Sequence, residues 1–131
     1  MKLPDLYEKI AAVYAAHNNI IIAVDFDDTV YDWKNKGWEC HKVVDLLLSA
    51  QEVLNTSIIL FTCREGEKLE FAKNFLEERG VILHGVNENP DFPYTSSKPF
   101  YNILLDDKAC LGECCLALQK LISCYDKRGE E

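Results

Sequence analysis

The feature that most constrains the fold is a series of short apolar runs rich in β-branched residues, separated by segments with helical periodicity. The first run, "IIIAVDF" at 20–26, is almost wholly apolar, which is typical of a strand covered on both faces. Apolar strands that alternate with helices favour a parallel sheet with right-handed crossovers. The predicted elements are a helix at 3–16, a strand at 20–26, a helix at 40–54, a strand at 57–62, a helix at 65–80, strands at 81–86 and 101–105, and a closing helix at 109–125.

This order predicts an α/β fold, with a three-layer Rossmann-like parallel sheet flanked by helices. At 131 residues the chain has the length of one domain, 1–131. The segments between the strands are too short to hold a separate cap domain. We expect a long ordered loop at 87–100, where prolines gather, and a frayed tail at 126–131.

Charge and hydropathy exclude several classes of partner. The net charge of −8 disfavours long nucleic acids, because an acidic surface repels phosphate backbones. The apolar runs are far shorter than the roughly 18–20 residues that span a bilayer, so no membrane contact is expected. The N-terminus "MKLPDLYEKI" lacks the basic start and apolar stretch of a signal peptide, which favours a cytoplasmic protein.

The six cysteines include no C-x-x-C pair of the kind that holds structural zinc. Four of them fall in the predicted closing helix: Cys110, Cys114, Cys115 and Cys124. We expect reduced, mostly buried thiols that pack as small hydrophobic side chains.

Charged and hydroxyl side chains gather where the predicted strands end or begin. Ligands of open α/β sheets bind outside the carboxyl ends of the strands, near a switch in strand order. Carboxylates, a hydroxyl and cations are therefore expected at one edge of the sheet: Asp25, Asp27 and Asp28 after the first strand, Thr62 and Arg64 after the second, Lys98 before the fourth, and Asp106 and Asp107 after it.

This set of side chains suits phosphoryl transfer through an aspartyl-phosphate. An aspartate carboxylate can attack phosphorus as a nucleophile. Bringing it to a phosphate monoester joins two anions, which requires Mg²⁺ and fixed hydrogen-bond donors. Since Mg²⁺ prefers oxygen ligands and uses few protein carboxylates, Asp25 and a carboxylate from Asp106 or Asp107 are the candidate ligands.

Four motifs in this order resemble the haloacid dehalogenase superfamily. They are "DFDDT" at 25–29, "ILFT" at 59–62, Lys98, and "LLDD" at 104–107. The stretch "KPFYNILLDDKA" at 98–109 is similar to the corresponding part of small capless phosphatases of that superfamily. The resemblance spans about 80 residues, from the first predicted strand to the fourth.

The resemblance implies a role for each matching residue. Asp25 would be the nucleophile and a metal ligand. Asp27 would be the general acid and base, with its backbone carbonyl on Mg²⁺. Thr62 would donate a hydrogen bond to the transferring phosphoryl group, and Lys98 would neutralise negative charge.

Four further residues complete the candidate site. The resemblance favours Asp107 as the remaining direct metal ligand and Asp106 as a partner of a metal-bound water. Which of the two binds the metal directly stays open. Asp28 is expected to stabilise a turn or cap a helix, or else to contact the substrate. Arg64 is either a clamp for the substrate phosphate or a surface residue at the start of a helix.

The segment 30–41 follows the candidate nucleophile and contains Trp33 and Trp38. We interpret it as a hairpin whose tryptophans pack on the domain, or as a flap that covers the site and contacts substrate. Without a cap domain the site is expected to be open, which suits a large substrate or completion by a second subunit of a homo-oligomer.

The function predicted from these residues is a Mg²⁺-dependent phosphatase that acts on a small phosphorylated substrate or a phosphorylated macromolecule. Two alternatives stay open. One is a phosphoacceptor module of the receiver kind, and the other is a non-catalytic binding domain with the same fold. The sequence does not identify the substrate.

Overall fold

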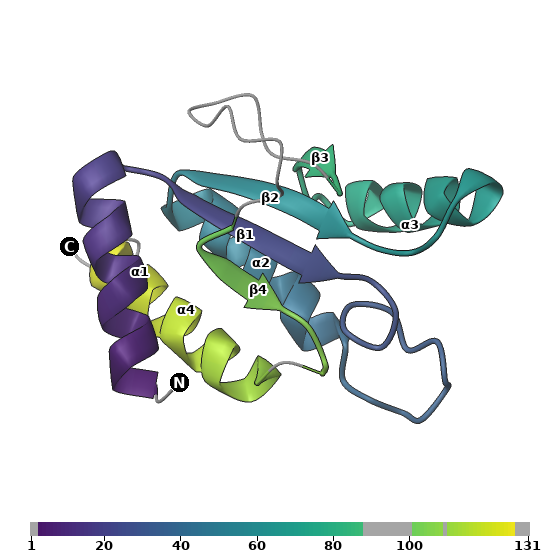
Figure 1. The fold of residues 1–131 in the computed structure, drawn as a ribbon, viewed down its shortest axis with the longest axis horizontal. Coiled ribbons are helices and arrows are strands. Elements are labelled where there is room, and N and C mark those ends of the chain that lie inside the picture. The colour runs from purple at the N-terminus through teal and green to yellow at the C-terminus, as the bar shows by residue number, and fades with distance from the viewer. Residues whose placement is uncertain (1–2, 88–100, 109, 128–131) are drawn as a thin grey trace.

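The computed structural model describes residues 3–87, 101–108 and 110–127. The first helix, α1 (Leu3–His17), leads into the central strand β1 (Ile20–Asp25). The remaining elements are α2 (His41–Val53), β2 (Thr56–Phe61), α3 (Gly66–Glu78), β3 (Leu83–Val86), β4 (Ile103–Leu105) and α4 (Leu111–Tyr125). Every predicted helix and strand is present, so the predicted α/β class with a Rossmann-like parallel sheet is confirmed (Figure 1).

The four strands form one parallel sheet in the order β3-β2-β1-β4. From β1 the chain steps outward to β2 and β3, and it then returns to place β4 on the other side of β1. The direction of strand progression therefore changes between β1 and β4. Such a switch point opens a crevice at the carboxyl ends of the strands, where α/β proteins bind their ligands.

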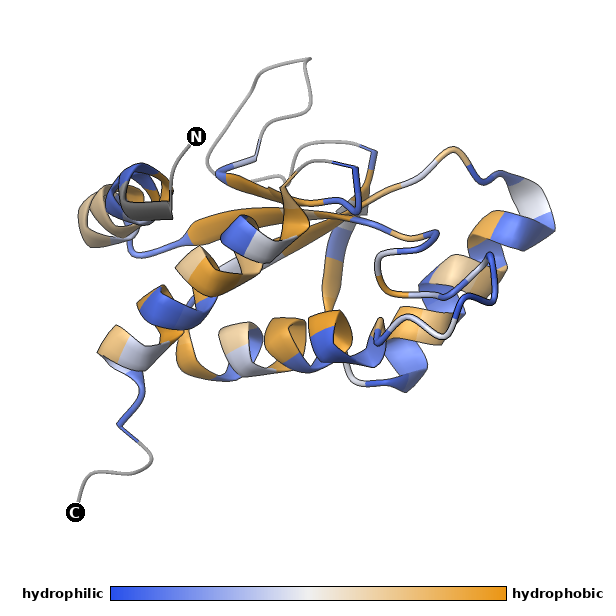
Figure 2. Cartoon of the chain, turned by 90° about the horizontal axis from the view of Figure 1, so that it is seen from below, coloured by the Kyte–Doolittle hydropathy of each residue, from blue (hydrophilic) through white to orange (hydrophobic). Residues whose placement is uncertain are grey.

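β1 is buried because it lies between two strands and its residues from Ile20 to Val24 are apolar. The helices cover the sheet with amphipathic faces: α1 and α2 both pack against α4, and α4 packs against β4. In Figure 2 the strands are almost wholly hydrophobic, whereas the helices alternate hydrophobic and hydrophilic residues. None of the helices in the described part of the chain has the length and apolar character needed to cross a bilayer.

Element boundaries differ from the predicted ranges where caps and side chains replace the regular backbone pattern. The predicted strand 81–86 begins at Leu83, because Val81 donates to the Leu76 carbonyl and so completes the end of α3. Gly80 takes a φ of +92° in this turn, a conformation that favours glycine. The predicted strand 101–105 begins at Ile103, after Asn102.

Asn102 extends the pairing of β4 with β1 by one residue, through one side-chain and one backbone hydrogen bond. Its side-chain Oδ1 accepts from the Ile21 amide at 2.7 Å, and its own amide donates to the Ile21 carbonyl at 2.8 Å. Of the predicted loop 87–100, residues 88–100 lie outside the described residues, as do 128–131 of the predicted frayed tail.

The prediction that the thiols are mostly buried is wrong. Cys40 and Cys114 are buried and Cys115 is half-buried, whereas Cys63, Cys110 and Cys124 are exposed. Cys110 lies just before α4 in a left-handed conformation, with a φ of 54°, so the closing helix begins at Leu111. The apolar periodicity describes residues inside α4, and Cys110 lies before the helix begins. The periodicity therefore did not show that Cys110 is exposed.

Candidate phosphoryl-transfer site

Acidic residues from β1 and β4 meet at the switch point of the sheet. β1 ends at Asp25, and Asp106 and Asp107 directly follow β4. Because Val24 pairs with Leu105, the residues that follow these two strands emerge side by side. One carboxylate oxygen from each of Asp25, Asp106 and Asp107 lies within 4.8 Å of the others. The structure thus brings together the three predicted carboxylates.

A tight turn after β1 positions the first of these carboxylates. The Phe26 carbonyl accepts hydrogen bonds from the amides of Thr29, Val30 and Tyr31, which ends the strand and reverses the chain. The buried Thr29 hydroxyl donates to Asp25 Oδ2 at 3.2 Å and accepts from the Asp107 amide at 2.9 Å. Thr29 therefore joins the end of β1 to the segment after β4. Sequence reasoning gave this residue no role, although its place in the "DFDDT" motif was a signal.

The acidic cluster is electrostatically unfavourable when fully ionised. Burial, and next the charge of Asp106, raise the pKa of Asp25 to about 6, although the hydrogen bond from Thr29 opposes the rise. Burial and the contact with Asp106 also raise the pKa of Asp107. No Lys, Arg or His in the described residues forms an ion pair with Asp25, Asp106 or Asp107. A bound cation would offset this repulsion.

The donor set fits Mg²⁺. All three residues offer carboxylate oxygens, the ligands that this hard cation prefers, and the set leaves room for water ligands. Asp106 Oδ1 accepts from the Lys108 amide at 3.0 Å, which holds the Asp106 side chain in place. The pocket in front of the carboxylates has a volume of about 290 Å³, and its lining includes Asp25, Asp27, Asp106 and Asp107.

Arg64 holds Asp27 through a bidentate ion pair. Arg64 Nη2 donates to Asp27 Oδ1 at 2.7 Å, and Nε donates to Oδ2 at 3.0 Å and Oδ1 at 3.2 Å. The Arg64 side chain is only 14% exposed, so its interpretation as a surface residue is wrong. Its guanidinium carbon lies 4.8 Å from the Phe26 ring centroid and 5.6 Å from that of Tyr31, which adds cation–π stabilisation.

Asp28 stabilises the turn, one of the roles predicted for it. It is buried and has a φ of 62°, in the left-handed region that aspartate tolerates better than most residues. Its Oδ1 accepts from the Lys34 amide at 3.0 Å, and its Oδ2 lies 4.0 Å from Lys34 Nζ. These contacts fix the loop that follows the candidate nucleophile.

Thr62 lies at the end of β2, beside the end of β1. Asn87 binds its backbone on both sides, donating to the Thr62 carbonyl at 2.8 Å and accepting from the Thr62 amide at 2.9 Å. The Thr62 hydroxyl accepts from the Arg64 amide at 3.1 Å, and its own proton stays available for donation. Lys98, the remaining predicted site residue, lies outside the described residues.

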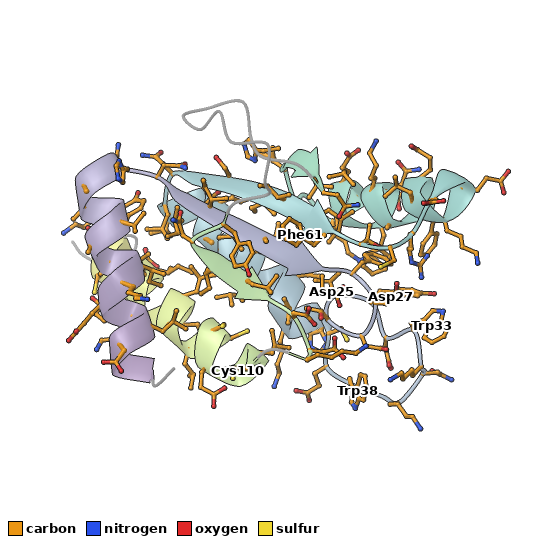
Figure 3. All side chains as sticks on the ribbon, in the orientation of Figure 1. Asp25, Asp27, Trp33, Trp38, Phe61 and Cys110 are labelled. Atoms are coloured by element: carbon orange, nitrogen blue, oxygen red, sulfur yellow. The ribbon has the colours of Figure 1, made fainter. Side chains whose placement is uncertain are left out.

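The prediction of a hairpin at 30–41 with packed tryptophans is wrong. The segment is a loop in which Tyr31 stacks on Phe26 at 5.2 Å between ring centroids, whereas Trp33 and Trp38 are 63% and 46% exposed. The carboxylate of Asp32 accepts from two backbone amides of the loop and so braces it. Figure 3 shows Trp33 and Trp38 pointing away from the strands, on the same side of the molecule as Asp25 and Asp27.

Comparisons with known proteins support the fold and supply no chemistry. No protein-family model matches the sequence. No curated protein matches it either. A solved structure from Bacteroides thetaiotaomicron, described as that of a conserved protein coded by a locus, is similar, with a TM-score of 0.57 and 29% sequence identity. The match covers 71% of this chain and 79% of that one. The chemistry must therefore be argued from the site itself.

The raised pKa of Asp25 predicts how the metal-free protein responds to pH. Between its ordinary value of 3.8 and about 6, the folded state binds more protons at Asp25 than the unfolded state does. Stability should therefore fall as pH rises through this range. Asp25→Asn should flatten this part of the pH dependence and raise the melting temperature of the metal-free protein at neutral pH.

The measurement is thermal unfolding in a chelator from about pH 4 to about pH 7, with Asp45→Asn, an exposed aspartate of α2, as the control. A variant Asp25→Asn with the same slope as the parent would show that the Asp25 carboxylate is not under electrostatic strain.

Proposed function

We propose that this protein is a Mg²⁺-dependent phosphomonoester hydrolase that works through an aspartyl-phosphate on Asp25. The observation that carries the proposal is the convergence of Asp25, Asp106 and Asp107 at the switch point between β1 and β4. These are three of the positions that the resemblance to the haloacid dehalogenase superfamily matches. The proposal covers the enzyme class, the metal and the roles of these residues.

Asp25, Asp106 and Asp107 would hold the ion, and it would supply positive charge against which a phosphate monoester can approach the Asp25 carboxylate. The hydrogen bond from Thr29 to Asp25 Oδ2 orients that carboxylate and leaves Oδ1 for attack. The Thr62 hydroxyl, at the end of the neighbouring strand, is the candidate donor to the phosphoryl oxygens.

The reaction would take two displacements at phosphorus. An Asp25 oxygen forms a bond to phosphorus as the bond from phosphorus to the ester oxygen breaks, and Asp27 gives its proton to the departing alkoxide. A water molecule then attacks the phosphorus of the aspartyl-phosphate and gives a proton to Asp27. Inorganic phosphate leaves, and the Asp25 carboxylate is restored.

The ion pair between Arg64 and Asp27 must open before these two reaction steps can take place. Both carboxylate oxygens of Asp27 accept hydrogen bonds from Arg64, and a carboxylate paired in this way has no proton to give. Arg64 must therefore release Asp27, and Asp27 must take up a proton, before the first displacement. A guanidinium released in this way could bind the phosphoryl oxygens, the clamp role predicted for Arg64.

Location in the cytoplasm and homo-oligomer formation stay predictions.

Replacing the nucleophile tests the proposal most simply. Asp25→Asn should lower kcat by several orders of magnitude, roughly the scale seen when a central catalytic group is removed, because an amide is a poor nucleophile. The measurement is Mg²⁺-dependent phosphate release from a panel of phosphomonoesters, with Asp45→Asn as the matched surface control. Near-parental turnover by folded Asp25→Asn would eliminate the covalent mechanism, and a parent that turns over no monoester would favour a phosphoacceptor or binding module.

Asp27→Asn tests proton transfer. The variant should keep the backbone carbonyl and lose about 10²–10⁴-fold in rate on an alkyl phosphate, the usual contribution of a general acid or base. The loss should shrink on an aryl phosphate, whose leaving group needs little protonation, if phosphorylation of Asp25 limits the rate. If hydrolysis of the aspartyl-phosphate is limiting, phosphoenzyme should accumulate instead.

Rapid-quench kinetics on both ester types distinguish these cases. Small and equal losses on alkyl and aryl esters, with no trapped phosphoenzyme, would remove Asp27 from the acid–base role.

A further inference from the structure

Two exposed aromatic rings stand beside the carboxylate pocket. Trp33 is 63% exposed and Phe71 is 45% exposed, although both are large hydrophobic side chains. They line the same cleft, which has a volume of about 760 Å³ and also includes Asp27 and Arg64 in its lining. Exposed aromatic side chains that converge on one cleft are typical of a ligand site.

This cleft adjoins the carboxylate pocket, because Asp27 and Trp33 line both. Figure 3 shows Asp25, Asp27 and Trp33 in succession outward from the end of β1. A phosphoryl group placed at Asp25 would occupy part of the smaller pocket, which has a volume of about 290 Å³. The rest of a phosphate monoester would then extend past Asp27 into the larger cleft, whose lining includes both rings.

The structure fixes the backbone at Trp33 and packs the Phe71 ring without burying either side chain. The Trp33 amide donates to the Tyr31 carbonyl at 2.8 Å, and the next residue, Lys34, is tied through its amide to Asp28. Phe71 packs edge-on against Tyr31 at 5.3 Å between ring centroids. The loop backbone that carries Trp33 and the Phe71 ring are therefore ordered before a ligand binds, which lowers the entropy cost of stacking.

The charges that line the cleft do not favour a second anionic group on the ligand. Three acidic residues, Asp27, Glu65 and Glu67, face two basic ones, Arg64 and Lys68, and Arg64 already pairs with Asp27. The cleft thus presents the aromatic rings of Tyr31, Trp33 and Phe71 among charged side chains whose signs nearly balance. Such a lining suits an uncharged planar ring better than a second phosphate, which would need an excess of cations.

We propose that the cleft binds an aromatic ring carried by the leaving group, so that the substrates are phosphate monoesters of nucleosides or other ring-bearing alcohols. The inference rests on the proposed function for the place of the phosphoryl group. Trp33 supplies the stacking surface, Phe71 lines the same cleft, and the bond that is cleaved lies at Asp27, which lines both the cleft and the carboxylate pocket.

Pairs of esters with the same leaving oxygen test this assignment. A nucleoside 5′-monophosphate is compared with ribose 5-phosphate, and benzyl phosphate with cyclohexylmethyl phosphate, all with Mg²⁺. Each pair differs in the ring and not in the chemistry of the bond cleaved, and the two pairs distinguish nucleobases from simple aryl groups. In at least one pair, the member that carries the aromatic ring should have a kcat/KM higher by roughly tenfold or more, the scale of one stacking contact.

Trp33→Ala should remove that preference, and Trp33→Phe should retain part of it. Trp38→Ala is the matched control, because Trp38 belongs to the same loop and is similarly exposed but does not line the cleft. Equal kcat/KM within both pairs, or a preference that survives Trp33→Ala, would overturn the inference and leave the proposed hydrolase intact.

Fluorescence separates the cleft from catalysis. Trp33 and Trp38 are the two tryptophans of the chain, so Trp38→Phe leaves Trp33 as the single reporter. Quenching by the nucleoside monophosphate but not by ribose 5-phosphate would support the cleft assignment. If neither ester is hydrolysed although such quenching is seen, the proposed function alone would be overturned. No quenching together with no turnover would overturn both.

Discussion

The candidate site depends on the burial of β1 between two parallel neighbours. Five apolar residues, Ile20–Val24, are enclosed by β2, β4 and the helices, so the first carboxylate of the strand, Asp25, appears only at its end. Because β4 pairs with β1 and ends at the level of Val24, Asp106 and Asp107 emerge next to Asp25. Strand order and strand length together decide that these charges meet.

The acidic residues at this edge fall into two electrostatic groups. Asp25, Asp106 and Asp107 crowd one another and have no cationic partner among the described side chains. Asp27, only two residues beyond Asp25, has its own cation in Arg64, which aromatic rings surround. The structure thus separates a carboxylate cluster that lacks a cation from a carboxylate that Arg64 already neutralises, and the ion pair with Arg64 favours the ionised form of Asp27.

Periodicity predicted the class and order of all the elements, because β1, β2 and β4 lie in apolar runs and the helices have amphipathic faces. Periodicity could not predict contacts between residues that are far apart in the sequence. The pairing of Arg64 with Asp27 spans 37 positions, and nothing local distinguishes Arg64 from a surface arginine. The loop after β1 is irregular, so spacing did not show that Tyr31, rather than Trp33 or Trp38, would turn inward.

The central claim is that Asp25 becomes covalently phosphorylated, and mapping the phosphate during turnover tests it most directly. The parent and Asp27→Asn are quenched in acid while they hydrolyse a labelled monoester with Mg²⁺, digested, and sequenced by mass spectrometry. The account predicts a hydroxylamine-sensitive phosphate on the peptide that contains Asp25, and none on that peptide in Asp25→Asn. Sustained hydrolysis with no phosphorylated peptide in either protein, or with the phosphate on another residue, would contradict the account.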